Sequence, residues 1–92
     1  MTMQRNKVYE LIDSERAYQD AKWGDIEQNP HTVLEWIKIA QEEMNEAFHE
    51  ESKSRKKSSH ATIEDALAEL RQVAAVCIAA LEQHGCPPRR PL

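Results

Sequence analysis

The glycines and prolines of this chain occur at only a few positions, and this restricts the fold more than any other feature. They are Gly24, Pro30, Gly85, Pro87, Pro88 and Pro91. The long segments between them are rich in Glu, Ala, Gln and Lys, which favour helix. We therefore expect an all-α fold, a compact bundle of about three main helices. The 92 residues are too few for more than one domain, so we expect a single domain over residues 1–92, of which 86–92 form a flexible tail.

The first expected helix covers residues 5–22 and ends at a Trp-Gly pair. Val8, Leu11, Ile12 and Tyr18 fall near one of its faces at helical spacing. Glu15 interrupts this apolar face.

Two capping signals mark the starts of the other helices. Thr32 and Glu35 form a capping box, and Thr62 can cap toward Asp65 in the same way. The second helix should run to about residue 51, and the third should end before Gly85. The apolar positions that we expect to face the core are Val33, Trp36, Ile37, Ala40, Met44, Ala47 and Phe48, then Leu67, Leu70, Val73, Ala74, Cys77, Ile78 and Leu81. The basic, serine-rich residues 52–60 read as a solvated loop, with a flap over phosphates as the alternative.

Charge and composition exclude several classes of function. The net charge of −4 argues against binding of a nucleic-acid polymer, which normally requires a basic face. Residues 1–10 contain no apolar segment of the kind found in a secretory signal, and no apolar run approaches a membrane span. The two cysteines then read as reduced thiols. We expect a cytoplasmic protein without membrane contact. Because so short a chain supports only a marginal core, we also expect it to pair with a copy of itself.

Acidic side chains stand one turn apart on two of the expected helices. Glu43 and Glu46 share a face of the second helix, and Glu69 and Gln72 share a face of the third. Carboxylates beside a core are costly unless a cation neutralises them. Magnesium is suited to this role, because it binds through a few carboxylates together with substrate phosphates. Antiparallel packing of the two helices would gather all four side chains around one or two ions.

Two other interpretations of these acids remain open. Glutamates three apart on a helix are common on solvated faces. Glu46 and His49 also fit the Glu-x-x-His pattern of di-iron bundles, although the third helix offers Glu69-x-x-Gln72 in place of a second such pattern.

The motifs together resemble a known family. Glu42-Glu43-Met44-Asn45-Glu46, followed after a spacer by Glu69-Leu70-Arg71-Gln72, is similar to the EExxE and ExxD motifs of MazG-like, all-α nucleoside triphosphate pyrophosphohydrolases. The segment Tyr18-Gln19-Asp20-Ala21-Lys22-Trp23-Gly24, then His31-Thr32, resembles the part that precedes the metal helix in that family. The run from Glu69 to Val76 resembles a phage and mobile-element branch.

The resemblance implies a homodimer or homotetramer that hydrolyses a nucleoside triphosphate to the monophosphate and pyrophosphate, with Mg²⁺ or Mn²⁺ as cofactor. It implies these roles: Glu43, Glu46, Glu69 and Gln72 as metal ligands; Glu42 or Glu46 as the group that activates water; Trp23 and His31 as contacts to the base; and Lys22, or a basic residue of the 52–60 loop, as a contact to the phosphates.

Gln72 departs from the family pattern, which has Asp at this position. An amide still offers an oxygen ligand, but it carries no negative charge. The alternative function is therefore a catalytically weak or inactive helical module that binds nucleotide or another protein.

Overall fold

Three helices make up the computed structural model, which describes residues 2–57 and 60–91. They are α1 (Arg5–Trp23), α2 (Val33–Ser54) and α3 (Ile63–His84), and the described residues contain no strand. The all-helical prediction is confirmed. Two residues of the expected basic loop, 58 and 59, and residue 92 of the expected tail lie outside the described part.

The predicted end of α2 was three residues short. The helix continues to Ser54 because its last turn makes its own local contacts. The Ser54 hydroxyl donates to the Glu51 carbonyl at 2.6 Å. Lys53 lies 3.5 Å from the carboxylate of Glu50, and a cation in the last turn also suits the helix dipole.

Both predicted capping boxes are present. The Thr32 hydroxyl accepts from the Glu35 amide at 3.1 Å, and the Glu35 carboxylate accepts from the Thr32 amide at 2.8 Å. Thr62 and Asp65 repeat this exchange at 3.3 and 2.7 Å. Each box satisfies amide groups that have no partner within the helix, so the starts of α2 and α3 are set locally.

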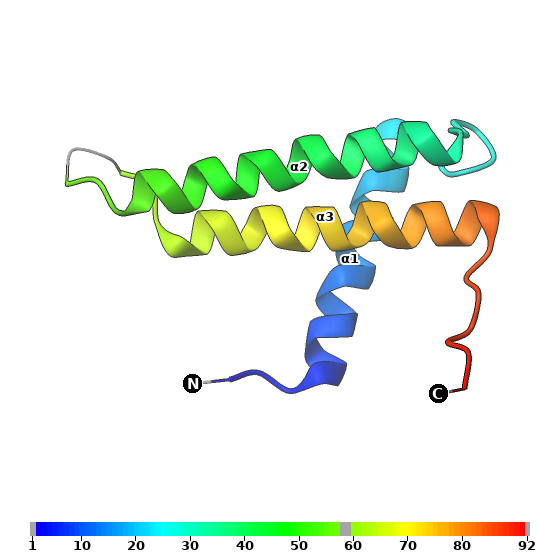
Figure 1. Cartoon of the computed structure of the whole chain (residues 1–92), viewed down its shortest axis with the longest axis horizontal. Helices are drawn as coiled ribbons and strands as arrows, with labels where there is room; N and C mark the ends of the chain where they lie inside the picture. Colours follow the sequence, from blue (N-terminus) through cyan, green and yellow to red (C-terminus); the bar gives the residue numbers. More distant parts are fainter. Residues whose placement is uncertain (1, 58–59, 92) are drawn as a thin grey trace.

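Figure 1 shows α2 and α3 side by side and antiparallel, with α1 crossing them steeply. The hairpin is long, and the chain measures 43 × 31 × 26 Å along its principal axes. α1 packs against α3, and its N-terminal half projects away from the hairpin (Figure 1). Among the described residues, no helix therefore covers the other side of the hairpin.

The core is built almost entirely from small side chains. Its buried apolar residues are Ala47, Ala66, Val73, Ala75, Val76 and Ala79. The alanines let α2 and α3 approach closely. Of the buried α3 residues, only Val73 belongs to the face that we predicted to be in the core. The predicted core faces are wrong for many larger residues, which remain at least 38% exposed: Val33, Ile37, Met44, Phe48, Leu67, Leu70, Ile78 and Leu81. They are exposed because α1 crosses the hairpin instead of lying along it.

Ion pairs hold α1 on α3. Arg16 is only 6% exposed, and its Nε lies 3.0 Å from the carboxylate of Glu82, while one terminal nitrogen lies 2.8 Å from Asp20. Glu82 and Asp20 raise the pKa of Arg16 against the opposing effect of burial. Arg71 makes a second link, with Nε 2.9 Å from the Glu15 carboxylate.

Residues 85–91 follow α3 without regular secondary structure and are exposed. Within the described residues, no helix has both the length and the apolar content that a membrane crossing requires.

Candidate functional site

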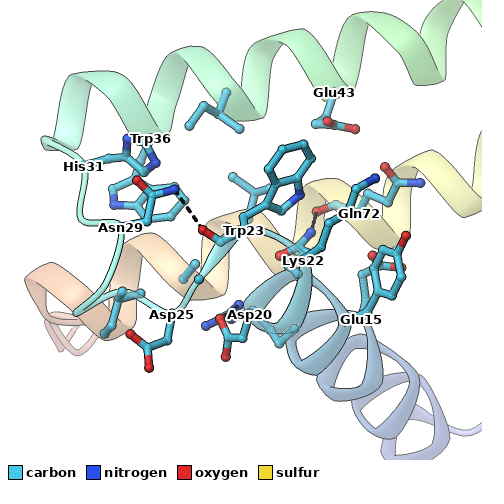
Figure 2. A pocket seen from close by; sticks show the side chains of 18 of the residues that line it. Glu15, Asp20, Lys22, Trp23, Asp25, Asn29, His31, Trp36, Glu43 and Gln72 are labelled. Carbon is cyan, nitrogen blue, oxygen red and sulfur yellow. Dashed lines mark hydrogen bonds and ion pairs between the residues drawn. The ribbon is translucent and has the colours of Figure 1, made fainter.

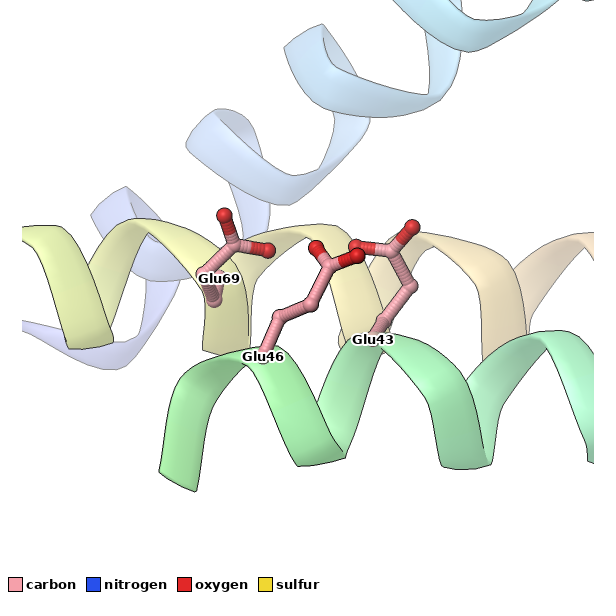
Figure 3. A group of neighbouring side chains, drawn as sticks. All are labelled: Glu43, Glu46 and Glu69. Atoms are coloured by element: carbon pink, nitrogen blue, oxygen red, sulfur yellow. The ribbon is translucent and has the colours of Figure 1, made fainter. Parts of the chain in front are cut away.

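Three of the four predicted metal ligands converge. Glu43 and Glu46 reach out from α2, and Glu69 reaches from α3 toward them (Figure 3). Each contributes a carboxylate oxygen that lies within 4.8 Å of the oxygens from the other two. We call these residues the acidic triad. The antiparallel pairing of α2 and α3 brings the two halves of the motif together, as the sequence predicts.

Burial is uneven within the acidic triad. Glu46 is exposed, whereas Glu43 and Glu69 are half-buried. The Oε2 atoms of Glu43 and Glu69 are fully buried and have no hydrogen-bond partner among the described residues. A buried carboxylate oxygen without a partner is unfavourable, and a proton, a cation or a bound water would each satisfy these two atoms.

The electrostatics of the acidic triad follow from this geometry. Burial, and after it the neighbouring carboxyl groups of Glu43 and Glu46, together raise the pKa of Glu69 to about 7. Burial and then the negative charge of Glu46 raise the pKa of Glu43. Near neutral pH these groups hold a proton between them, and a divalent cation would displace it. Hard carboxylate oxygens, two of them buried and unsatisfied, are a donor set that fits Mg²⁺.

A cleft of about 760 Å³ opens beside the acidic triad, between α1, α3, the first half of α2 and the loop that joins α1 to α2. Its walls include Lys22, Trp23 and His31, which are the predicted substrate contacts, together with Glu43 and Gln72 (Figure 2). Glu43 thus belongs to both the acidic triad and the cleft. The fold brings these five predicted residues, which span 51 positions of sequence, to one site.

Trp23 lines the cleft and is 64% exposed, so it is not part of the core. The ammonium nitrogen of Lys22 lies 4.9 Å from the centre of the Trp23 ring, a cation–π distance. Gly24 ends α1 with φ of 90°, a conformation that side chains disfavour. The Asn29 side chain donates to the Trp23 carbonyl at 3.3 Å and closes the loop.

Trp36 and Gln83 hold His31 in position, and neither belongs to the motifs that predict the site. The His31 imidazole packs edge-on against Trp36, with ring centres 4.6 Å apart. The Gln83 amide oxygen accepts from the His31 amide at 3.1 Å and from the Trp36 indole at 2.8 Å, and its nitrogen donates to the His31 carbonyl at 2.8 Å. Nothing in the periodicity of α3 distinguishes Gln83, because its partners lie 47 and 52 residues away.

The remaining candidates are not among the three residues of the acidic triad. Gln72 lies in the cleft between Glu43 and Glu15 (Figure 2). Glu42 is exposed and belongs neither to the acidic triad nor to the cleft wall. His49 is exposed and stacks edge-on with Phe48 at 6.0 Å, and it does not join the acids that converge among the described residues.

Comparisons with protein-family models, with curated proteins and with solved structures found no match to this chain. The class of protein is therefore described from the fold and the site alone. It is an all-helical protein with an acidic triad next to a polar and aromatic cleft.

Proposed function

We propose that this chain is a magnesium-dependent nucleoside triphosphate pyrophosphohydrolase. The observation that carries the proposal is the pair of buried, unpartnered carboxylate oxygens of Glu43 and Glu69 beside a cleft that shares Glu43. The cleft, at about 760 Å³, falls in the range that small-molecule sites occupy. The likeness of the two acidic motifs to those of MazG-like enzymes is the second support.

In this proposal Glu43, Glu46 and Glu69 hold the cation, Mg²⁺ or Mn²⁺, and the amide oxygen of Gln72 is the fourth available ligand. The bound ion would supply positive charge against the phosphate oxygens. Glu46 is the member of the acidic triad exposed to solvent, so it is placed to orient a water molecule and accept its proton. Trp23 and His31 would contact the nucleoside, and Lys22 the phosphates.

The reaction joins the water oxygen to the α-phosphorus and breaks the bond between the α- and β-phosphates. The products are the nucleoside monophosphate and pyrophosphate. The Trp23 and Trp36 side chains in the wall of the cleft favour an aromatic base. The acidic end of the cleft can accept phosphates only when a cation is present.

We also propose that a second copy of the chain covers the open side of the hairpin. That side carries an apolar groove of about 370 Å³ between the C-terminal half of α2 and the N-terminal half of α3. It is lined by Met44, Ala47, Phe48, Glu51, Ile63, Ala66, Leu67 and Leu70. Phe48 is 66% exposed there, and a core of alanines and valines is small for a stable single chain.

The test is product analysis by anion-exchange chromatography after incubation with Mg²⁺ and each common nucleoside triphosphate. We expect monophosphate and pyrophosphate in equal amounts from at least one substrate. Glu43→Gln and Glu69→Gln should reduce turnover at least about 100-fold, since each removes charge from the cation site. Glu64→Gln, on an exposed part of α3, is the matched control and should retain activity.

Two outcomes would contradict enzymatic activity. If no substrate is hydrolysed but calorimetry detects nucleotide binding, the protein is the non-catalytic nucleotide-binding module, which the amide at Gln72 already favours. If neither hydrolysis nor binding occurs, the cleft is not a nucleotide site.

A further inference from the structure

Three cationic side chains line the cleft, and they are engaged to different degrees: Arg16, Lys22 and Arg71. Arg16 is 6% exposed and is bound on both sides by Glu82 and Asp20. Lys22 places its ammonium over the ring of Trp23. Carboxylates of the fold thus hold three of the five N–H donors of Arg16. Arg71 uses only its Nε donor in this way.

Arg71 is anchored along one edge only. Its Nε donates to the carboxylate of Glu15 at 2.9 Å. The Glu15 side chain is only 10% exposed and comes from α1, so it is a fixed partner on the opposite helix. The Arg71 side chain is 44% exposed, and its two terminal nitrogens make no hydrogen bond with any residue in the described part of the chain. An arginine held in this way presents a planar set of donors in a restricted orientation.

This arginine lies near the acidic end of the cleft. It precedes Gln72, and Figure 2 shows the Gln72 side chain between Glu15 and Glu43. Gln19, one turn after Glu15, donates to the Gln72 carbonyl at 3.4 Å and keeps α1 against this stretch of α3. The charge of Glu15 also contributes to the raised pKa of Glu43, which indicates that the Glu15–Arg71 pair and the acidic triad share one electrostatic environment.

We propose that Arg71 binds the phosphate chain of the nucleotide through its terminal nitrogens, with Glu15 as its positioning residue. This rests on the proposed function. A triphosphate carries more negative charge than one divalent cation neutralises, and an amide at position 72 weakens the case for a second cation. The guanidinium supplies the missing positive charge and matches two phosphate oxygens at once.

The test is isothermal titration calorimetry of the full chain with inorganic triphosphate in the presence of Mg²⁺, a probe without base or sugar. We expect Arg71→Gln to weaken triphosphate binding at least about 10-fold, the usual loss for a charged hydrogen bond. Arg71→Lys keeps the charge but not the paired donors, so it should bind with intermediate affinity. The control is Arg5→Gln, which removes an exposed arginine at the start of α1, outside the cleft lining, and should bind like the parent.

A second measurement needs no variant. Modification of the parent chain by an arginine-specific dicarbonyl reagent, read by mass spectrometry, should slow at Arg71 and not at Arg5 when magnesium triphosphate is added. If the parent binds triphosphate and Arg71→Gln binds it equally, or if Arg71 is not protected, this assignment is wrong while the proposed function stands. If the parent binds no triphosphate, both are wrong.

Discussion

The fold changes the ionisation of Glu69 strongly, since burial and the neighbouring carboxyl groups of Glu43 and Glu46 raise its pKa to about 7 from an ordinary value near 4.5. Between these values the folded chain holds a proton that the unfolded chain has lost. The cation-free protein should therefore lose stability as pH rises through this window. We expect its melting temperature to be at least about 4 °C lower at pH 8 than at pH 5.5. This difference corresponds to about 1 kcal/mol in the free energy of unfolding. Differential scanning calorimetry in a chelating buffer measures this.

Glu69→Gln is the control for this prediction, because it cannot ionise and also reports any contribution from the histidines. Its melting temperature should change much less over the same range. Added Mg²⁺ should stabilise the parent more at pH 8 than at pH 5.5, because the cation displaces a proton at the lower pH. A parent that responds to pH in the same way as Glu69→Gln would show that Glu69 titrates normally.

Gln72 is the residue at which the acidic motif is incomplete. We predict that Gln72→Asp binds Mg²⁺ about 10-fold more tightly than the parent, because a carboxylate adds one negative charge beside Glu43. Asp is one methylene shorter than Gln, so Gln72→Glu separates charge from length. Calorimetric titration with Mg²⁺ decides. If neither variant binds Mg²⁺ more tightly than the parent, Gln72 is not a metal ligand. The non-catalytic module then becomes the better proposal for the function.

At the scale of the elements, the loop between α1 and α2 is held by α3 through Gln83. Gln83→Leu removes the three hydrogen bonds to His31 and Trp36 and leaves the His31 amide and the Trp36 indole without a partner. We expect a loss of about 1–3 kcal/mol in the free energy of unfolding and faster hydrogen exchange of the Trp36 indole. Urea denaturation and NMR measure the two effects.

The matched control for this element is Gln41→Leu, on an exposed position of α2. It should leave both the unfolding free energy and the indole exchange close to those of the parent. Equal exchange in Gln83→Leu and the parent would mean that the loop is held by other contacts, such as that of His84 with the His31 carbonyl at 2.8 Å.

At the scale of the whole molecule, a small core and an exposed apolar groove predict self-association. Light scattering at micromolar concentration should give at least twice the chain mass of 10.6 kDa. Phe48→Asp places a charge in the groove and should shift the mass toward one chain, since a charge buried at an interface is costly. A parent of single-chain mass would show that the groove has another role.

The local sequence determined the helices and much of the acidic site. Thr32 and Thr62 set helix starts through contacts three residues away, and Gly24 and Gly85 follow helix ends through their own backbone freedom. Spacing by one turn likewise placed Glu43 and Glu46 on the face that meets Glu69. These features follow from interactions within one helical turn, which a sequence displays directly.

Only the tertiary structure decided how α1 crosses the hairpin, and several features of the site follow from that crossing. It buries Arg16 against Glu82, 66 positions away, pairs Glu15 with Arg71, and opens the cleft. It also leaves apolar residues of α2 and α3 exposed that periodicity assigned to the core. Periodicity identifies an apolar face but not what covers it, because coverage depends on contacts between residues far apart in the chain. The raised pKa of Glu69 depends on tertiary packing in the same way, since burial between helices is its main cause.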